Sequence, residues 1–307
     1  MISARPSPCQ KGIVSAVARL GAVVATKAGH TVSVSTHKTP PGADLLVNPP
    51  SAPVSSCHAF AEGLDRAVRL GTEWILAVPE RENCILAYMI ADMASMSGDQ
   101  RLHQIVEEFL ANPRLPSDNV WRRVLDPTAK VRGPTQQQLA RLQDYHRWFV
   151  YAIASDEVRM PTSERTALFA PDRFVWGSRT HQLFALLLYR NRVERGPSID
   201  ALINHLCEKI AREAKWDIRI TDLYLQRIAF LLAAGRPNLV KRRWIERVIV
   251  GQAANGGWVS SWHGWGPGLF AFTLRKRSPN AHTTVQGVWI LYMLKYRYPM
   301  WIEGQCQ

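Results

Sequence analysis

Apolar residues recur every three or four positions through most of the chain after His58. This spacing is typical of amphipathic helices, and breaks between the segments fall at Gly and Pro sites such as Gly196-Pro197. No segment shows the strict alternation of a strand. The sequence therefore predicts an all-α protein, with helices over 59–78, 82–98, 100–112, 135–155, 179–195, 198–214, 220–235, 238–254 and 282–298.

The predicted helices in the second half of the chain have two textures. Segments 202–214 and 240–252 are charged on one face, whereas 182–189, 223–235 and 285–295 are apolar nearly all round. A helix that is apolar all round is buried, and one with a charged face borders solvent. The alternation predicts inner and outer layers of helices, either closed into an α/α toroid, as a partial or complete ring, or stacked as a solenoid.

A weak internal repeat agrees with this architecture. His181, Asp222 and His282 each lie just inside the start of a predicted buried helix, separated by 41 and 60 residues. Repeats of this length are typical of solenoids and toroids, with one helix pair per repeat. Four positions after each of these residues stand Ala185, Gln226 and Gln286.

The N-terminal part of the chain has a different composition. Residues 31–57 are dense in Pro, Ser and Thr, and such a segment cannot bury enough apolar surface to fold alone. We predict a disordered, basic leader over residues 1–57 and a single toroid domain over residues 58–307.

The charge balance and the cysteines bear on partners and compartment. The net charge of +13 favours anionic partners, such as an anionic lipid surface; a solvated basic face without a partner is the alternative. No nucleic-acid reading motif is present, so nucleic acid is disfavoured as a partner. The five cysteines are scattered without metal-ligand spacing, which argues against a disulfide framework and suits a reducing compartment. We expect a cytoplasmic protein, peripheral at the membrane if it binds lipid.

One stretch, GQAANGGWVSSWHGWGPG over residues 251–268, is rich in both glycine and tryptophan. Its first half contains Gln252, Gly256 and Trp258, which resemble the Gln-xxx-Gly-x-Trp repeat core of squalene and hopene cyclases. The resemblance to the terpenoid cyclase and protein prenyltransferase superfamily implies an α/α toroid with a central cavity. In physical terms we expect a structural clasp, in which Gln reaches the backbone, Gly takes a positive φ and Trp packs across a helix junction.

The chemistry of that superfamily does not carry over. The DxDD acid motif of class II cyclases is absent, and so is the Asp, Cys and His set with which prenyltransferases bind zinc. We therefore expect no metal and no cofactor. The resemblance implies an apolar or isoprenoid-like ligand in the cavity, bound by either an enzyme or a non-catalytic relative.

Inner-helix starts point toward the cavity in that superfamily, so the repeat positions are candidate site residues. Asp222, His181 and His282 could perform acid–base catalysis. The alternative for Asp222 is an N-terminal helix residue placed by the helix dipole, with Thr221 as cap. We expect ligand contacts from Gln226, Gln286 and Tyr224, with Arg227 a weaker candidate, and from Trp262, His263 and Trp265 in the Trp-rich loop.

Two other functions stay open. An α/α-barrel carbohydrate-active enzyme needs two carboxylates at one cavity, and Asp172 could pair with Asp222. A non-catalytic helical scaffold with a basic binding surface would instead have its interior filled by side chains.

Overall fold

The computed structural model describes residues 57–78, 83–171, 178–217, 222–259 and 278–305, and within them it is all-α, as predicted. The only extended pairing in these residues is the isolated bridge between Gln252 and Trp258. The helices are α2 (Cys57–Ala77), α3 (Cys84–Ser97), α4 (Gln100–Ala111), α5 (Gln136–Ala140), α6 (Asp144–Ile153), α7 (Thr162–Leu168), α8 (Ser178–Arg192), α9 (Pro197–Trp216), α10 (Asp222–Ala233), α11 (Arg242–Val250), α12 (Ala281–Tyr292) and α13 (Pro299–Gly304). Short helical turns cover Val120–Val124, Pro237–Leu239 and Met293–Arg297.

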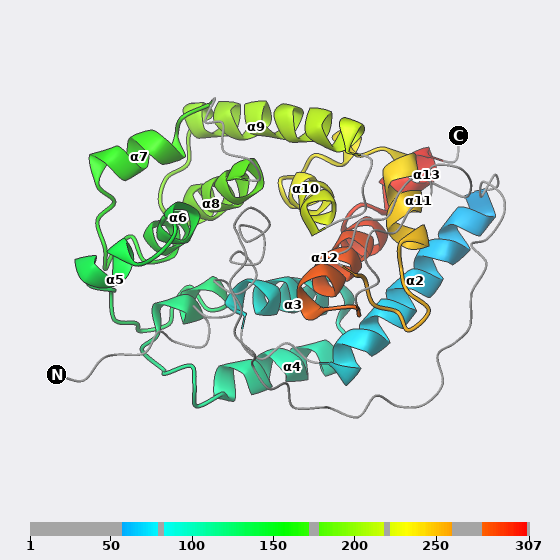
Figure 1. Cartoon of the computed structure of the whole chain (residues 1–307), viewed down its shortest axis with the longest axis horizontal. Helices are drawn as coiled ribbons and strands as arrows, with labels where there is room; N and C mark the ends of the chain where they lie inside the picture. Colours follow the sequence, from blue (N-terminus) through cyan, green and yellow to red (C-terminus); the bar gives the residue numbers. More distant parts are fainter. Residues whose placement is uncertain (1–56, 79–82, 172–177, 218–221, 260–277, 306–307) are drawn as a thin grey trace, which may run out of the picture.

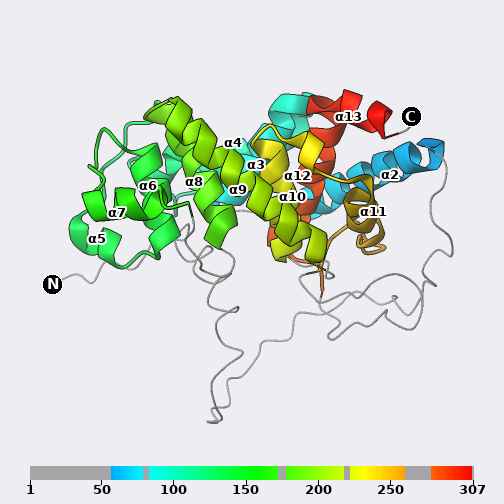
Figure 2. The same cartoon turned by 90° about the horizontal axis from the view of Figure 1, so that it is seen from above.

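The helices lie in two layers (Figure 1). Helices α3, α6, α8, α10 and α12 lie inside, and α2, α4, α7, α9 and α11 lie around them. Figure 2 shows α5 and α7 at one end of the molecule and α2 and α11 at the other, with α8, α10 and α12 between them. The inner helices are the apolar ones: every residue from Tyr224 to Leu232 in α10 is buried, and so is every residue from Thr283 to Tyr292 in α12. Closure into a full toroid stays a prediction.

The interior of the inner layer is filled by a column of aromatic rings. Phe184 stacks on Phe230 with ring centroids 5.0 Å apart, and Phe149 meets Phe184 edge-on at 5.4 Å. Tyr88 contacts both Phe184 and Trp289, and Phe230 contacts Trp289. Each of the five inner helices thus contributes one ring, and edge-to-face pairs of this kind stabilise a core beyond their buried area.

The predicted helix over 135–155 is wrong in one respect, because the chain breaks between α5 and α6. A capping box between Thr135 and Gln138 opens α5, which ends at Ala140. At the break, the Arg147 guanidinium donates to the carbonyl of Leu142 and also pairs with Glu164 at 2.6 Å. A side chain therefore satisfies a carbonyl that a continuous helix would have used.

The Gln-xxx-Gly-x-Trp motif joins three helices. Gln252 Nε2 donates to the carbonyl of Ala67 in α2 and to that of Gly256, both at 2.9 Å. Trp258 is fully buried; its indole N–H donates to Val248 in α11 at 2.8 Å, and its backbone N–H donates to Thr284 Oγ1 in α12 at 2.9 Å. These are the kinds of contact that the sequence predicts for a clasp between an outer helix and the next inner one.

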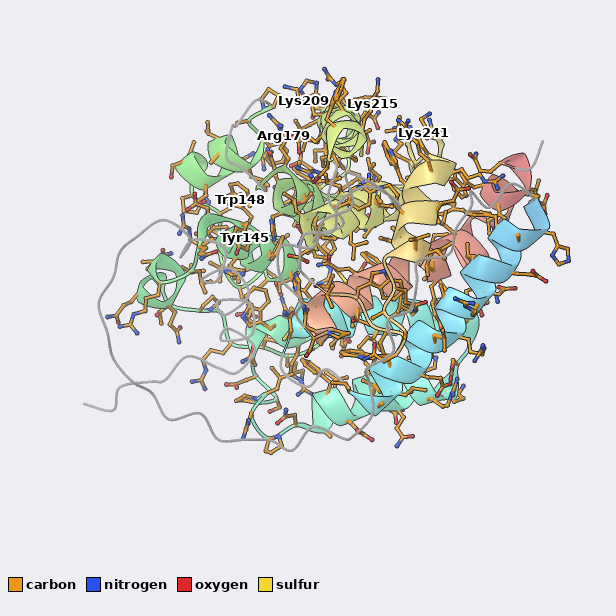
Figure 3. The ribbon with its side chains drawn as sticks, turned by 45° about the vertical axis from the view of Figure 1, so that its right-hand side comes forward. Tyr145, Trp148, Arg179, Lys209, Lys215 and Lys241 are labelled. Carbon is orange, nitrogen blue, oxygen red and sulfur yellow. The ribbon has the colours of Figure 1, made fainter. Side chains whose placement is uncertain are left out.

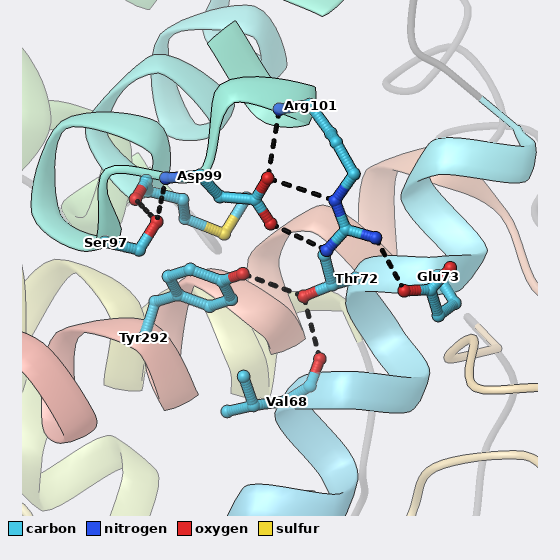
Figure 4. Close-up of polar contacts among 8 residues, drawn as sticks. Val68, Thr72, Glu73, Ser97, Asp99, Arg101 and Tyr292 are labelled. Atoms are coloured by element: carbon cyan, nitrogen blue, oxygen red, sulfur yellow. Dashed lines mark hydrogen bonds and ion pairs between the residues drawn. The ribbon is translucent and has the colours of Figure 1, made fainter.

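Helix α2 also packs against α12 and α4 (Figure 4). The Thr72 hydroxyl donates to the Val68 carbonyl and lies 2.9 Å from the Tyr292 hydroxyl, inside the protein. Nearby, Arg101 bridges Asp99 and Glu73 at the surface. Residues more than two hundred positions apart therefore meet at this junction.

The cysteines differ from the expectation. Cys57 and Cys84 are both disulfide-bonded, which runs against the expectation that the scattered cysteines form no disulfide framework. Cys207 is free and buried, and burial raises the pKa of its thiol to about 12, which makes it a poor nucleophile near neutral pH. Among the described helices, none has the length and apolar character needed to cross a membrane.

Candidate functional site

The three repeat positions stand at the beginnings of inner helices. His181 lies in the first turn of α8, Asp222 opens α10 and His282 is the second residue of α12. These helices are neighbours in the inner layer (Figure 1), with α10 packed between α8 and α12. Their N-terminal ends therefore bring two imidazoles and a carboxylate to one region.

The closest pair in this region is Asp222 and His282. His282 Nε2 lies 3.0 Å from Asp222 Oδ1 and 3.0 Å from the side-chain amide nitrogen of Gln286. The side chains of Asp222 and His282 keep 23% and 29% of their surface exposed, although both belong to inner helices. Part of each side chain is therefore accessible at the N-terminal ends of α10 and α12.

The surroundings hold Asp222 in its ionised form. Burial alone would raise its pKa, but His282, His181 and the Gln286 amide stabilise the carboxylate, and the net effect lowers the pKa below its ordinary value. Asp222 is therefore an anion at neutral pH, and its oxygens can only accept hydrogen bonds.

The structure adds two residues that the sequence pattern did not single out, Tyr145 and His146 at the start of α6. The Tyr145 ring lies 4.3 Å from the His181 ring and 4.2 Å from the His146 ring. Burial, together with the nearby His181, lowers the pKa of His146 to about 3, so this imidazole is neutral at pH 7. Figure 3 marks Tyr145 on α6 beside α8. No sequence signal singled these two residues out, because the repeat of polar helix starts is recognisable only from His181 onward.

Several buried polar atoms in this region have no hydrogen-bond partner. They include Asp222 Oδ1, Gln286 Oε1 and the Tyr145 hydroxyl, even though the His282 ring lies at ion-pair distance from Asp222. Buried polar atoms are nearly always satisfied, by protein, water or ligand. Two of the three are pure acceptors and the third can donate or accept, which is the pattern that a hydroxyl-bearing ligand would complement.

Other candidate residues lie elsewhere or have internal partners. Tyr224 was predicted to contact the ligand, but its hydroxyl donates to the Trp244 carbonyl and its ring faces the Arg247 guanidinium at 4.4 Å, both on α11. Gln226 accepts a hydrogen bond from Thr180 Oγ1 at 2.8 Å, between α10 and α8. Arg227, the weaker candidate, pairs with Asp217 and Glu213. The structure thus brings Gln286, but not Tyr224 or Arg227, to the region of Asp222.

The remaining expectations concern residues outside those described. Trp262, His263, Trp265 and Asp172 all lie in the undescribed segments. Within the described parts of the chain, no group of three or more His, Cys, Asp or Glu side chains is arranged to hold a metal ion.

Comparison with known proteins does not assign the chain to a family. No family model matches it, and neither a curated protein nor a solved structure is significantly similar to it.

Proposed function

We propose that the N-terminal ends of α8, α10 and α12 form an acid–base site for a hydroxyl-bearing ligand. The observation that carries the proposal is the Asp222–His282 pair, at 3.0 Å, together with two buried polar atoms that have no hydrogen-bond partner, Gln286 Oε1 and the Tyr145 hydroxyl. The ionised Asp222 would accept a hydrogen bond from the ligand. His181 or His282 would transfer a proton, since imidazole is the side chain whose ordinary pKa lies nearest neutrality.

The polarity of this region favours a carbohydrate-like ligand over the isoprenoid-like one that the superfamily resemblance suggests. The interior below the site is occupied by aromatic rings such as Phe184 and Phe230. An apolar ligand would instead require an apolar chamber over this polar end. Kinship with terpenoid cyclases and an apolar ligand therefore remain proposals, and a ligand retained through native mass spectrometry would support them.

The proposed location of the protein also changes. Two disulfide-bonded cysteines, Cys57 and Cys84, are typical of oxidising compartments. They argue against the cytoplasmic location that the cysteine spacing suggested, whereas the basic charge still favours an anionic surface as a partner.

The proposal is tested by incubating the protein with a panel of oligosaccharides and uronide oligomers and following products by mass spectrometry. The variants Asp222→Asn and His282→Gln remove the carboxylate and the imidazole with little change in volume. Loss of general acid–base catalysis lowers turnover by roughly 10²–10⁴-fold, so the turnover of both variants should be reduced by that factor.

The chain contains a matched control pair. His58 Nδ1 lies 3.2 Å from Glu62 Oε1 on the exposed face of α2, so it has the same residue chemistry without burial. The variants His58→Gln and Glu62→Gln should keep wild-type turnover. If wild-type activity survived in both site variants, or if saturation-transfer NMR showed the same ligand binding to wild type and Asp222→Asn, the assignment would be wrong.

A further inference from the structure

The outer layer contains a groove that plays no part in the site described above. It runs between α9 and the start of α11 and has a volume of about 640 Å³. This volume lies within the range of small-molecule sites, roughly 300–1,000 Å³. None of its lining residues belongs to the group around Asp222, so the groove is a separate feature of the surface.

The groove has a buried floor and charged walls. Trp244, which is 3% exposed, and the half-buried Ala211 and Leu239 give it apolar lining. Five of its lining residues are Lys or Arg, and only two, Glu208 and Glu246, are acidic. The lining of this concavity therefore has more positive than negative side chains.

Most of these cations lack a carboxylate partner. Arg242 is the exception, because it pairs with Glu246 at 2.8 Å, donates to the Gln305 carbonyl and covers the Phe60 ring. The other four cations are Arg212, Lys215, Lys241 and Arg243, and all four are exposed. Among the described residues, no carboxylate lies within ion-pair distance of any of them.

The four come from both walls. Arg212 and Lys215 lie three positions apart on α9, whereas Lys241 is the N-cap of α11 and Arg243 lies in its first turn. Figure 3 shows Lys215 and Lys241 on these two neighbouring helices. Like charges held around one hollow repel each other, and a multivalent anion bound between them would remove that repulsion.

We propose that this groove binds a ligand with two or more phosphate groups. Phosphate matches the two types of cation present, since guanidinium groups bind its oxygens in pairs and lysine ammonium groups act as point charges. A ligand with a single charge would neutralise only part of the groove, whereas adjacent phosphates can reach cations on both walls.

The test is isothermal titration calorimetry with inorganic tripolyphosphate at low ionic strength. The double variant Lys215→Gln/Arg243→Gln removes one cation from each wall. Its control, Lys130→Gln/Arg141→Gln, removes one exposed Lys and one exposed Arg, which precede and follow α5 in the chain. Helices α5 and α11 lie at opposite ends of the molecule (Figure 2). Wild type and control should bind with one site and similar affinity. The groove variant should bind at least about tenfold more weakly, a few-fold for each charge-assisted hydrogen bond removed. Because the two residues substituted in each double variant are exposed, thermal melts should show that both variants are folded.

The outcomes separate specific binding from general charge attraction. Equal loss of affinity in both double variants, or wild-type affinity in the groove variant, would overturn the proposal. A second arm uses phosphatidylcholine vesicles doped with phosphatidylinositol bisphosphate. Vesicle binding that tripolyphosphate displaces identifies a lipid head group as a source of the phosphates, and tripolyphosphate binding without vesicle binding identifies a free ligand. Because the groove shares no residue with Asp222 or His282, Asp222→Asn should bind tripolyphosphate like wild type.

Discussion

Replacing Trp258 by Ala is the sharpest test of how the layers are held together. The indole is fully buried and packs on the backbone of Gly287, where a Cβ added to the glycine would lie only 2.8 Å from the ring. Truncating a buried Trp to Ala costs roughly 3–5 kcal/mol in reduced burial and cavity formation. The Val248 carbonyl would also lose its donor at 2.8 Å, which adds about 1 kcal/mol and places the expected loss toward the upper end of that range.

The assay is urea unfolding followed by far-UV circular dichroism, with Trp216→Ala as the matched control. Trp216 is 76% exposed at the end of α9, so its truncation should change the free energy of unfolding by less than about 0.5 kcal/mol. A Trp258→Ala variant that lost under about 1 kcal/mol would show that the indole does not hold α11, α12 and α2 together, and the clasp interpretation would fail.

Two further predictions concern stability. Gly256 has φ of +89° and a Cβ there would lie 2.2 Å from the Leu70 carbonyl oxygen, so Gly256→Ala should cost more than about 2 kcal/mol in urea unfolding. Gly98→Ala, at φ of +72° with open space around it, should cost only about 1 kcal/mol, and equal losses would contradict the role of the Leu70 carbonyl. Folding lowers the pKa of His146 from 6.5 to about 3, so between these pH values the unfolded chain is protonated at His146 and the folded chain is not. The free energy of unfolding should therefore drop as the pH falls from 6.5 toward 3, by roughly 1.4 kcal/mol per pH unit. His146→Gln should flatten this part of the pH profile measured by thermal melts, and an unchanged slope would mean that His146 does not titrate in this way.

Much of the fold could be predicted because the residues that become buried recur at helical spacing along the sequence. The predicted helix over 198–214 lies within α9, and that over 282–298 covers α12 and the turn after it. The break after α5 could not be predicted, because it depends on Arg147 reaching the Leu142 carbonyl, a hydrogen bond made by side-chain geometry rather than spacing. Helix α7 was missed because its seven residues are too few to show a period.

The candidate site could be predicted as positions but not as contacts. The repeat indicated that Asp222 and His282 begin inner helices, and from this we expected that they lie near each other. It could not give the 3.0 Å pairing, which depends on how α10 and α12 are rotated against each other. Tyr145 could not be predicted for a related reason: the repeat of polar helix starts is recognisable only from His181 onward, and a Tyr among the aromatic residues of α6 has the pattern of a core residue.

Burial and polarity alone do not distinguish the site from the framework. Arg227 is more buried than Asp222, with 5% of its side chain exposed, yet it is saturated by Asp217 at 2.5 Å and Glu213 at 3.2 Å. Removing one member of such a pair leaves an uncompensated charge, so its role is to hold the connection from α9 to α10. Asp222 lies five residues before Arg227; its Oδ1 has a single ion-pair partner, His282, and the neighbouring Gln286 Oε1 is buried without a hydrogen-bond partner. This difference in hydrogen-bond saturation supports the proposal that Asp222 binds a ligand, whereas Arg227 holds α10 in place.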